Sequence, residues 1–382
     1  MKVLNVIVSL DPVNGGGAVE RTFQMSLSLV KAGIKCTVLT TNLGLTSERV
    51  KAMEGVKIIA APCLNKRFYI PKWSFSEIVG VIKDADIIHL MEHWTLQNAL
   101  IYFLARHFNK PYVVCAAGAL QIYGRSKWLK KIYNMIIGKK IINSAVFCIA
   151  ITADEIPHFR SYGVYKDKIV IIPNGIDREN LRIQNNAEFR NKYGLGKNRI
   201  VLFVGRLNRI KGPDLLLEAF CNAKDELRNY QLIFCGPDEG MLCQLKRTAD
   251  SYFMGDRIHF LGYLGGADKS MAYHAADLLV IPSRQEAMSI VVLEAGITGT
   301  PILITDQCGF SEIAIVDGGQ VVPASVSGLQ TGLIEILRDP VQLKAKGANL
   351  EKFVSERFIW DSLVNEYIKL YSKILHNKKK LL

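Results

Sequence analysis

Short, almost wholly apolar segments recur along the first half of this chain, and segments with the spacing of helices lie between them. The apolar segments are residues 2–10, 35–41, 86–91, 111–116, 147–152 and 169–173. Residues 16–33 repeat apolar side chains near i, i+4 and i+7, and a second helix is expected at 96–108. A strand buried on both faces reads as a continuous apolar run, so this alternation predicts a parallel sheet covered by helices.

The alternation pauses at residues 173–198, which are polar, rich in Asn and Gly and only weakly periodic, and then it restarts. The second series predicts strands near 199–205, 231–236, 258–262, 278–283, 301–305 and 320–322, and helices at 213–227, 239–250, 268–275, 289–298 and 310–316. A chain of 382 residues suits two cores of about 150 to 200 residues each. We therefore predict an α/β protein of two doubly wound, Rossmann-like domains, residues 1–173 and 174–355, with 173–198 as a linker.

Composition disfavours several classes of protein. The chain has no uninterrupted apolar run near the roughly 20 residues that span a bilayer, and residues 1–12 read as a first strand rather than a signal peptide. Its eight cysteines are scattered and form no C-x-x-C pair, which disfavours disulfide frames and cysteine-based zinc sites. We expect a cytoplasmic protein with reduced thiols and no metal.

The net charge of +13 is unevenly distributed. Residues 93–153 contain no Asp or Glu, yet they hold eight Lys or Arg, and the chain ends in HNKKKLL. Such a field favours an anionic partner, which could be nucleic acid, acidic lipid or a phosphorylated substrate.

Open parallel sheets bind ligands beyond the carboxyl ends of their strands, so functional side chains are expected in the loops there. The loop 9–22 contains Gly15, Gly16 and Gly17 just before a helix, where bare backbone can approach a phosphate. The glycines do not follow G-x-G-x-x-G, and no acid ends the next strand, so NAD is disfavoured. The alternative is a tight turn without a ligand.

A basic loop follows the first strand of the second series. In VGRLNRIKGPD (204–214), Arg206 and Lys211 lie five positions apart around a turn. Arg presents a planar fork of donors and Lys a compact charge, and together they are able to clamp a diphosphate. The alternative is an ordinary solvated basic loop.

Two glutamates bracket an apolar run in SRQEAMSIVVLEAG (283–296). Glu286 is expected at the loop crest, Ser289 as the cap of the next helix and Glu294 about one and a half turns inside it. Carboxylates accept hydrogen bonds from hydroxyls, so a loop acid and a helix acid could grip a polyhydroxylated ligand. The alternative is one surface acid and one helix acid. A further turn at 305–314, with Gly309 at its tip, could add backbone amides to an anion site.

Together these elements resemble the group 1 (family 4-type) retaining glycosyltransferases of the GT-B fold, over nearly the whole chain. The resemblance rests on GRL-x3-KG at 205–212, the E-x7-E element Glu286/Glu294, IPNGID (172–177) and the glycine loop. It implies two domains facing each other across a cleft, with 1–173 on the acceptor side, 174–355 binding the donor and a final helix, 356–382, crossing back to the first domain. The pattern looks like bacterial enzymes of capsule, O-antigen or exopolysaccharide assembly.

The resemblance also implies roles for residues. Arg206 and Lys211 would hold the donor's diphosphate, Glu286 the sugar hydroxyls and Glu294 the ribose. Amides near Ser289 and Ile290 would support the β-phosphate, and the glycine loop would face the diphosphate. No metal would be needed, since fixed cations stabilise the leaving phosphate. The acid pair in DAD (84–86) begins a buried strand and is discounted.

Two departures from the family pattern concern the sugar and the acceptor. Where members usually have Gly-Phe-Gly after the first acid, this chain has Ala287, Met288 and Ser289. Many members end the strand matching 111–116 with His or Arg, whereas here it continues as Ala116-Ala117-Gly118. His93 and Trp94, on a neighbouring loop, are candidates for part of that acceptor-side role, and a core or surface histidine is the alternative.

Residues 124–142 repeat Trp128, Ile132, Ile136 and other apolar side chains at helical spacing, flanked by lysines. This pattern is typical of an interfacial helix on anionic lipid, and also of a domain helix with solvated lysines. Nucleic acid is disfavoured, because the chain shows no basic and aromatic stacking platform.

The favoured function is a cytoplasmic, membrane-peripheral, metal-independent transferase of the hexosyl type. It would move a sugar from a UDP- or GDP-type donor to a hydroxyl of a glycan or lipid-linked glycan, with retention of configuration. The alternatives are a nucleotide-sugar epimerase of the same shape, a non-catalytic sugar-binding protein and a degenerate transferase subunit.

Overall fold

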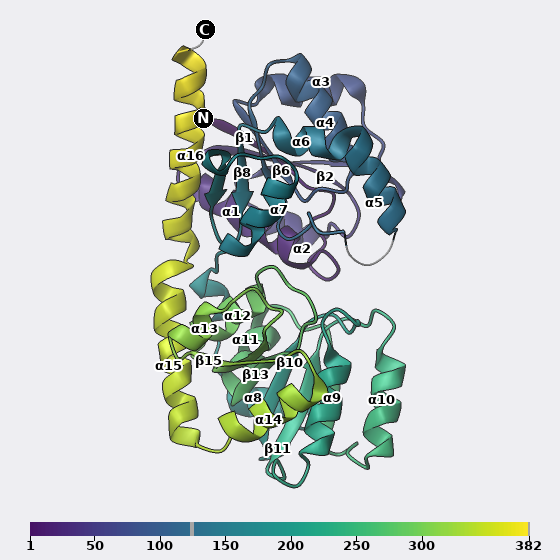
Figure 1. The fold of residues 1–382 in the computed structure, drawn as a ribbon, viewed down its shortest axis with the longest axis vertical. Coiled ribbons are helices and arrows are strands. Elements are labelled where there is room, and N and C mark those ends of the chain that lie inside the picture. The colour runs from purple at the N-terminus through teal and green to yellow at the C-terminus, as the bar shows by residue number, and fades with distance from the viewer. Residues whose placement is uncertain (123–125, 381–382) are drawn as a thin grey trace. The chain divides into compact units, whose positions relative to one another are not determined.

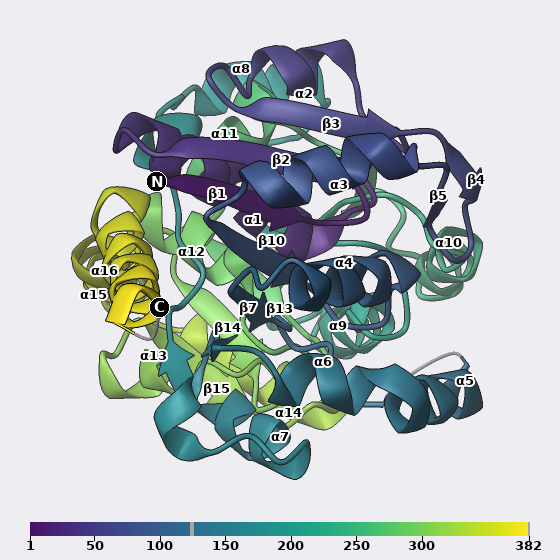
Figure 2. The ribbon, with the colours of Figure 1, turned by 90° about the horizontal axis from the view of Figure 1, so that it is seen from above.

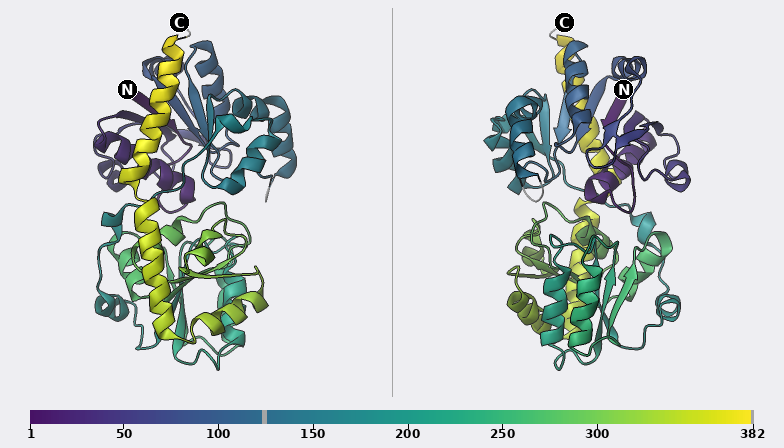
Figure 3. Two further views of the ribbon diagram at one scale, coloured as in Figure 1. Left: turned by 60° about the vertical axis from the view of Figure 1, so that its left-hand side comes forward. Right: turned by 90° about the vertical axis from the view of Figure 1, so that its right-hand side faces the viewer.

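The computed structural model describes residues 1–122 and 126–380 (Figure 1). The chain divides into two compact units. Unit 1 comprises Met1–Gly175 and Trp360–Leu382, and unit 2 comprises Ile176–Ile359. Each unit contains one parallel sheet with helices on both faces (Figure 3), so the predicted fold class of two doubly wound α/β domains is confirmed.

The sheet of unit 1 has seven strands in the order β3-β2-β1-β6-β7-β8-β9, and every neighbouring pair is parallel. The strands are β1 (Lys2–Val6), β2 (Lys35–Thr41), β3 (Lys57–Ala61), β6 (Ile87–Met91), β7 (Tyr112–Cys115), β8 (Phe147–Ala150) and β9 (Ile169–Ile171). The order reverses between β1 and β6, which makes their carboxyl ends the topological switch point. The edge strand β3 was not predicted, and of its five residues only Ile59 and Ala61 are buried.

Helices cover both faces of this sheet, and a small hairpin stands beside it. The helices are α1 (Gly16–Lys31), α2 (Ser47–Lys51), α3 (Phe75–Asp84), α4 (Leu96–His107), α5 (Lys127–Tyr133), the π-helical turn η1 (Asn134–Gly138), α6 (Lys139–Asn143), α7 (Ile156–Ser161) and α16 (Trp360–Lys380). The hairpin pairs β4 (Cys63–Asn65) with β5 (Ile70–Pro71). Apolar side chains of the central strands, such as Leu4, Ile88 and Val114, form the core between sheet and helices.

A buried arginine attaches the C-terminal helix to unit 1. Arg21 on α1 is 1% exposed and donates to Asn174 Oδ1 at 2.7 Å, to the Ile172 carbonyl at 2.8 Å and to the Tyr367 hydroxyl on α16. A buried charge is tolerated only when its donors are bonded in this way. Arg21 therefore holds three parts of unit 1 together, namely helix α1, the segment that follows β9, and helix α16.

The sheet of unit 2 has six strands in the order β12-β11-β10-β13-β14-β15, again all parallel. The strands are β10 (Arg199–Val204), β11 (Tyr230–Cys235), β12 (Ile258–Gly262), β13 (Leu278–Ile281), β14 (Ile302–Thr305) and β15 (Gly319–Val322). The helices are α8 (Asn186–Lys192), α9 (Pro213–Asn222), α10 (Leu242–Ser251), α11 (Gly266–Ala275), α12 (Ile290–Ile297), α13 (Glu312–Ile315), α14 (Val326–Ile336) and α15 (Pro340–Arg357). Here the order reverses between β10 and β13.

Two expectations about the connections were wrong. Residues 173–198 are not a free linker, since α8 packs on α11 and buries Phe189 completely. The final helix expected at 356–382 is present as α16, but it begins at Trp360 because α15 extends to Arg357. The weak periodicity of 173–198 hid α8, which is held by tertiary packing more than by local pattern.

Candidate functional site

The two loops at the switch point of unit 2 meet through a pair of opposite charges. Lys211 follows β10 and Glu286 follows β13, and Lys211 Nζ lies 2.6 Å from Glu286 Oε1. The second carboxylate oxygen, Oε2, accepts a hydrogen bond from Ser283 Oγ at 3.0 Å. Both charged side chains are largely buried, so each neutralises the other at the edge where ligands of such sheets bind.

These two loops are locked together by further contacts. The guanidinium of Arg284 forms a two-pronged pair with Asp214, at 2.8 and 2.7 Å, and also donates to the Arg209 carbonyl at 2.8 Å. Gly212 has φ +68°, and a Cβ at this position would lie 2.0 Å from the Pro282 carbonyl oxygen. Only glycine fits such an approach, so the backbone after Lys211 lies directly on the β13 loop.

The second cation of the predicted clamp, Arg206, is paired with an acid that was not predicted. Its Nη1 lies 2.9 Å from Glu239 Oε1, and Asn208 Nδ2 donates to Glu239 Oε2 at 2.6 Å. Glu239 comes from the loop after β11. About a third of each ion-pair side chain is exposed, so the pair is weak and a bound anion is able to replace the carboxylate.

Glu294 lies inside α12 and has a separate set of partners. Its carboxylate is almost fully buried and accepts from Lys269 Nζ at 2.5 Å and from the Tyr273 hydroxyl at 2.6 Å. Burial and the neighbouring Glu294 charge raise the pKa of Tyr273 well above its usual value, so this hydroxyl remains a donor. Glu286 and Glu294 thus belong to two adjoining networks, and Lys269 and Tyr273 are members that sequence analysis missed.

The start of α12 carries an unsatisfied hydroxyl. Ser289 occupies the cap position before Ile290, but its side chain makes no capping hydrogen bond, so that expectation was wrong. Its Oγ is fully buried and has no hydrogen-bond partner within the part of the chain that the structure describes. A buried polar atom of this kind calls for an explanation, and a ligand oxygen at the helix start would supply the missing partner.

The turn at Gly309 touches the crest of the Glu286 loop. Gly309 has φ +57°, and a Cβ there would lie 2.1 Å from the Ala287 carbonyl oxygen. The amide of Glu286 donates to the Gln307 carbonyl at 2.9 Å. Four loops, following β10, β11, β13 and β14, therefore contribute to one cluster in unit 2, which includes the predicted residues Arg206, Lys211, Glu286 and Gly309.

In unit 1 the glycine loop lies at the switch point, after β1. Asp11 organises it, since its Oδ1 accepts from the Val13 and Asn14 amides at 2.8 and 3.1 Å. Helix α1 begins at Gly16, which has φ +67°, and its first turn contains no acid. Gly16 and Gly17 are exposed. The loop is thus a firmly held turn with an open helix start, and its phosphate-binding role stays a prediction.

His93 and Trp94, the acceptor-side candidates, follow β6 on the other side of that switch point. His93 is 1% exposed, its Nε2 bonds Asn134 Oδ1 at 2.9 Å, and rings of Trp94, Tyr133 and Tyr162 surround it. Burial lowers the pKa of His93 to about 4, so the ring is neutral. His93 is therefore a buried packing residue, and it would affect acceptor binding only by positioning the residues around it.

The preceding residue, Glu92, is a functional candidate that sequence analysis missed. It has φ +61°, an uncommon conformation for a non-glycine residue, and its amide donates to the Cys115 carbonyl at 2.9 Å. No hydrogen bond to its half-buried carboxyl is seen among the described residues, and burial raises the pKa of Glu92 to about 7. Ala117, after the neighbouring strand β7, has φ +47°, so two strained residues lie side by side.

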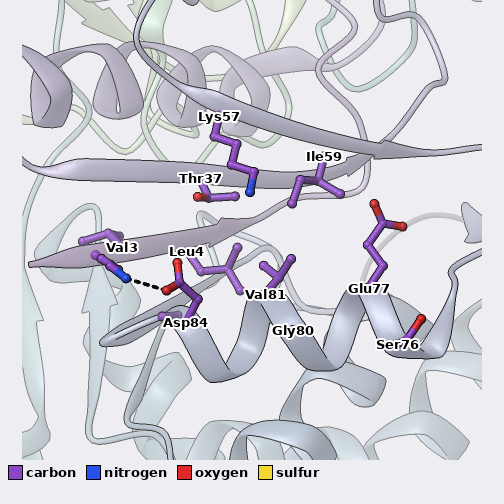
Figure 4. Close-up of a pocket in the computed structure, with 12 residues that line it drawn as sticks. Val3, Leu4, Thr37, Lys57, Ile59, Ser76, Glu77, Gly80, Val81 and Asp84 are labelled. Carbon is purple, nitrogen blue, oxygen red and sulfur yellow. Dashed lines mark hydrogen bonds and ion pairs between the residues drawn. The ribbon is translucent and has the colours of Figure 1, made fainter.

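No cluster of metal-ligating side chains occurs within residues 1–122 and 126–380. In the DAD segment, Asp84 forms an ion pair with Lys2, and Asp86 accepts a hydrogen bond from the Lys2 amide. Both acids therefore have structural partners at the start of β1. A pocket of about 370 Å³ lies between α3 and strands β1 to β3, where Figure 4 shows Glu77 and Asp84 on α3 and Lys57 on β3. It contains none of the predicted site residues, and Lys2 and Lys57 are the first residues of their strands.

Comparison with known families divides the chain in two. Residues 185–353 match the family Glycosyl transferases group 1, and residues 15–180 match Glycosyltransferase Family 4. A D-inositol 3-phosphate glycosyltransferase of Gordonia bronchialis is 30% identical over 395 residues, covering 95% of this chain and 85% of that protein.

Solved structures share the fold over the full length. The Anabaena HepE protein in complex with UDP and glucose superposes with a TM-score of 0.81 at 17% identity, covering 98% of this chain and 100% of that one. Sucrose-phosphate synthase from Thermosynechococcus elongatus gives a TM-score of 0.78 at 22% identity, covering 98% and 99%. With these matches and with the cluster at the β10/β13 switch point, the chain belongs to the group 1 glycosyltransferases.

Proposed function

We propose that this glycosyltransferase takes a hexosyl group from a nucleoside diphosphate sugar of the UDP or GDP type. The observation that carries the proposal is the Lys211–Glu286 contact at the switch point of unit 2, with Arg206 on the same loop as Lys211. A cation beside a carboxylate suits a ligand that carries phosphate and sugar hydroxyls together. The carboxylate accepts from hydroxyls, while the cation attracts phosphate oxygens.

The reaction breaks the bond between the sugar's anomeric carbon and the diphosphate oxygen. Negative charge grows on that oxygen, and fixed donors aimed at it lower the barrier. We assign this role to Arg206 and Lys211, supported by the amides at Ser289 and Ile290 and at the Gly309 turn. The two side-chain cations supply the charge stabilisation for which other transferases use a metal, so the proposed mechanism is metal-independent.

Glu286 and Glu294 would hold different parts of the donor. Glu286, between Lys211 and Ser283, is placed to accept from sugar hydroxyls, and Glu294, held by Lys269 and Tyr273, to accept from the ribose. Each carboxylate oxygen has two acceptor sites, so both acids keep capacity for a ligand. We further propose that the sugar is transferred with retention and that the donor phosphate takes the acceptor's proton, which leaves no step that requires a separate base.

We assign acceptor binding to the switch point of unit 1. Glu92 supports this, because its half-buried carboxyl has no hydrogen-bond partner among the described residues and is therefore able to bond an acceptor hydroxyl. The glycine loop with Gly15, Gly16 and Gly17 flanks the same switch point, and Ala116 and Ala117 leave room where many relatives carry a bulkier side chain. His93 and Trp94 would hold the Glu92 loop in place rather than contact the acceptor.

For the biological role we propose assembly of cell-surface polysaccharide on the inner face of the plasma membrane. The acceptor would be a glycan or a lipid-linked glycan, and residues 124–142 would contact anionic lipid. Gly124 and Arg125 lie outside the described residues. The Gordonia relative's name points to a phosphorylated polyol as acceptor instead, so D-inositol 3-phosphate is the competing choice.

The test begins with the donor. Thermal unfolding of the wild type and of Glu294→Ala would be followed with UDP, GDP, ADP, CMP and NAD, and exposed Glu218→Ala on α9 is the matched control. A ligand at 100 times its Kd stabilises a protein by about 2.7 kcal/mol. We expect one nucleoside diphosphate to stabilise the wild type and Glu218→Ala but not Glu294→Ala.

The second step separates transfer from the alternatives. The matching nucleotide sugars would be incubated with lipid-linked glycan, D-inositol 3-phosphate or no acceptor. Acceptor-dependent release of nucleoside diphosphate establishes transfer and identifies the acceptor class. An isomerised nucleotide sugar formed without acceptor would establish an epimerase. Diphosphate binding without turnover of any donor would establish the degenerate subunit.

A further inference from the structure

Helix α4 of unit 1 is apolar on its outer face as well as on its inner face. Ile101, Tyr102 and Ala105 are buried in the core, as expected for a covering helix. The opposite face presents Leu96, Leu100 and Phe103, which are 54%, 37% and 58% exposed. A helix that is hydrophobic all round is normally covered on all sides, so this outer face lacks a partner within unit 1.

The neighbouring segment 126–143 adds a second apolar row. The predicted stripe divides, because Leu129, Tyr133 and Ile137 turn toward the domain. Trp128, Ile132, Met135 and Ile136 turn outward, with exposures of 64%, 38%, 77% and 62%. The segment is not one continuous α-helix as predicted, since the π-helical turn η1 separates α5 from α6. That turn brings Asn134 inward to His93, which leaves Met135 and Ile136 at the surface.

These rows adjoin each other and the β4–β5 hairpin. The Tyr133 hydroxyl donates to the carbonyl of Thr95, the cap of α4, at 3.0 Å, and α4 packs against β5. Seen from above in Figure 2, the hairpin, α4 and α5 follow one another along one side of unit 1. The hairpin adds exposed Leu64 and Phe68. An apolar surface drawn from three elements exceeds the scattered hydrophobics of an ordinary surface.

The charge around this surface is of one sign. Residues 55–76, which include the hairpin, contain four Lys or Arg and no acid, as residues 93–153 contain eight and no acid. Lys127, Lys131, Lys139 and Lys140 are exposed beside the outward row of α5 and η1. The acids that border these two stretches in sequence are Glu54, Glu77, Glu92 and Asp154. Apolar side chains ringed by cations match a bilayer with anionic headgroups, which attract each Lys near the surface.

No helix of the described residues has the length and apolar character needed to cross a bilayer. We propose that unit 1 docks on an anionic lipid surface through a platform of three elements, the β4–β5 hairpin, the outer face of α4 and the α5–η1 segment. The platform is wider than the single segment 124–142. The platform extends the proposed function, since a lipid-linked acceptor would be presented at that surface. Only this biological purpose of the platform rests on the proposed function.

Vesicle binding tests the platform without any substrate. The wild type would be sedimented with vesicles of phosphatidylcholine alone and with vesicles containing 30% phosphatidylglycerol. Leu100→Glu/Phe103→Glu removes the α4 face, Ile132→Glu/Ile136→Glu removes the α5–η1 row, and Val341→Glu, at an 80%-exposed position of α15, is the matched control. Each variant is first checked for a wild-type melting temperature.

We expect the wild type and Val341→Glu to bind the anionic vesicles, and each double variant to bind at least about tenfold more weakly, since binding scales with buried apolar area. Brominated acyl chains should quench fluorescence of the wild type, and Trp128→Phe should remove most of that quenching. A wild-type affinity in Leu100→Glu/Phe103→Glu would overturn the platform. So would equal binding to both vesicle types, or dimerisation of the wild type that this variant abolishes.

Donor-sugar hydrolysis measured without vesicles keeps the two proposals apart. If the protein hydrolyses the donor sugar but does not bind vesicles, only the platform proposal is overturned. Vesicle binding by a protein that turns over no donor overturns only the transferase.

Discussion

Lys211 Nζ lies 2.6 Å from Glu286 Oε1, although 75 residues separate the two side chains in sequence. The contact joins the loops that follow β10 and β13, the two strands between which the sheet order of unit 2 reverses. Both charges are largely buried, so neither is left without a counterion when the ligand is absent. A donor phosphate would compete with Glu286 for Lys211, and the sugar hydroxyls would then compensate Glu286.

Removing the Lys211 charge should damage both stability and turnover. Lys211→Ala leaves the Glu286 carboxylate buried without its cation, and loss of one charge-stabilising donor costs about 10² to 10³ in kcat. Glu286→Gln alone should lower stability less, because the Lys211 ammonium that then loses its counterion is 23% exposed and reaches water more easily than the 13%-exposed Glu286 carboxylate. The double variant should therefore melt above Lys211→Ala. Calorimetric unfolding and donor turnover check both statements, and Lys346→Ala, at the Lys346–Asp317 surface pair, serves as the control.

Freeing Arg206 from its internal carboxylate should tighten diphosphate binding. Breaking a partly exposed ion pair such as Arg206–Glu239 costs about 0.2 to 1 kcal/mol. Glu239→Gln should therefore lower the Kd for the preferred nucleoside diphosphate about 1.4- to fivefold, whereas Arg206→Ala should raise it. Isothermal titration in low salt measures both. An unchanged Kd in Glu239→Gln would mean that the diphosphate does not reach Arg206.

Much of the fold was predictable because buried parallel strands are visible as apolar runs. The strands from β10 to β14 each appear in the sequence as such a run, whereas β3 has only two buried residues and begins with an exposed lysine. Helices α14 and α15 were not predicted from the sequence. Their positions depend on packing within unit 2 rather than on a strong local pattern. The division of roles between the two units as acceptor and donor sides remains a prediction.

The site was only partly predictable for a different reason. Arg206, Lys211, Glu286 and Gly309 stand at strand ends, where the chain itself indicates ligand loops. Glu239 and Lys269 reach the cluster from other loops and helices, and no spacing in the sequence connects them to it. Glu92 escaped because its backbone angle and missing partner are visible only in three dimensions. The signal available in sequence was its position directly after a buried strand, as for Glu286.

The backbone contact at Gly212 should be essential for the position of Lys211. Gly212→Ala introduces both a strained φ and a Cβ 2.0 Å from the Pro282 carbonyl, whereas Gly194→Ala, with φ +63° and open space, introduces the strain alone. We expect Gly194→Ala to cost about 1 to 2 kcal/mol of unfolding free energy and Gly212→Ala clearly more, with a fall in kcat for Gly212→Ala only. Equal losses in the two variants would show that the β10 and β13 loops are not in contact.

The Glu92 carboxyl should make the protein less stable as the pH rises. Burial raises its pKa from 4.5 to about 7 in the folded protein, so between these values the folded state binds more protons than the unfolded state. The unfolding free energy therefore decreases as pH rises from about 4.5 to 7, and the penalty persists above that range. For a half-buried group we expect a penalty of about 1 to 2 kcal/mol, below the limit set by the full shift.

Glu92→Gln removes the ionisation and keeps the shape. At pH 8.5 it should melt above the wild type, and at pH 4, below the unfolded pKa, the two proteins should melt nearly together. Exposed Glu54→Gln, in the same unit, is the control and should follow the wild type at both pH values. If Glu92→Gln melts below the wild type at pH 8.5, the carboxylate has a stabilising partner in solution, and Glu92 would no longer be available to bond an acceptor hydroxyl.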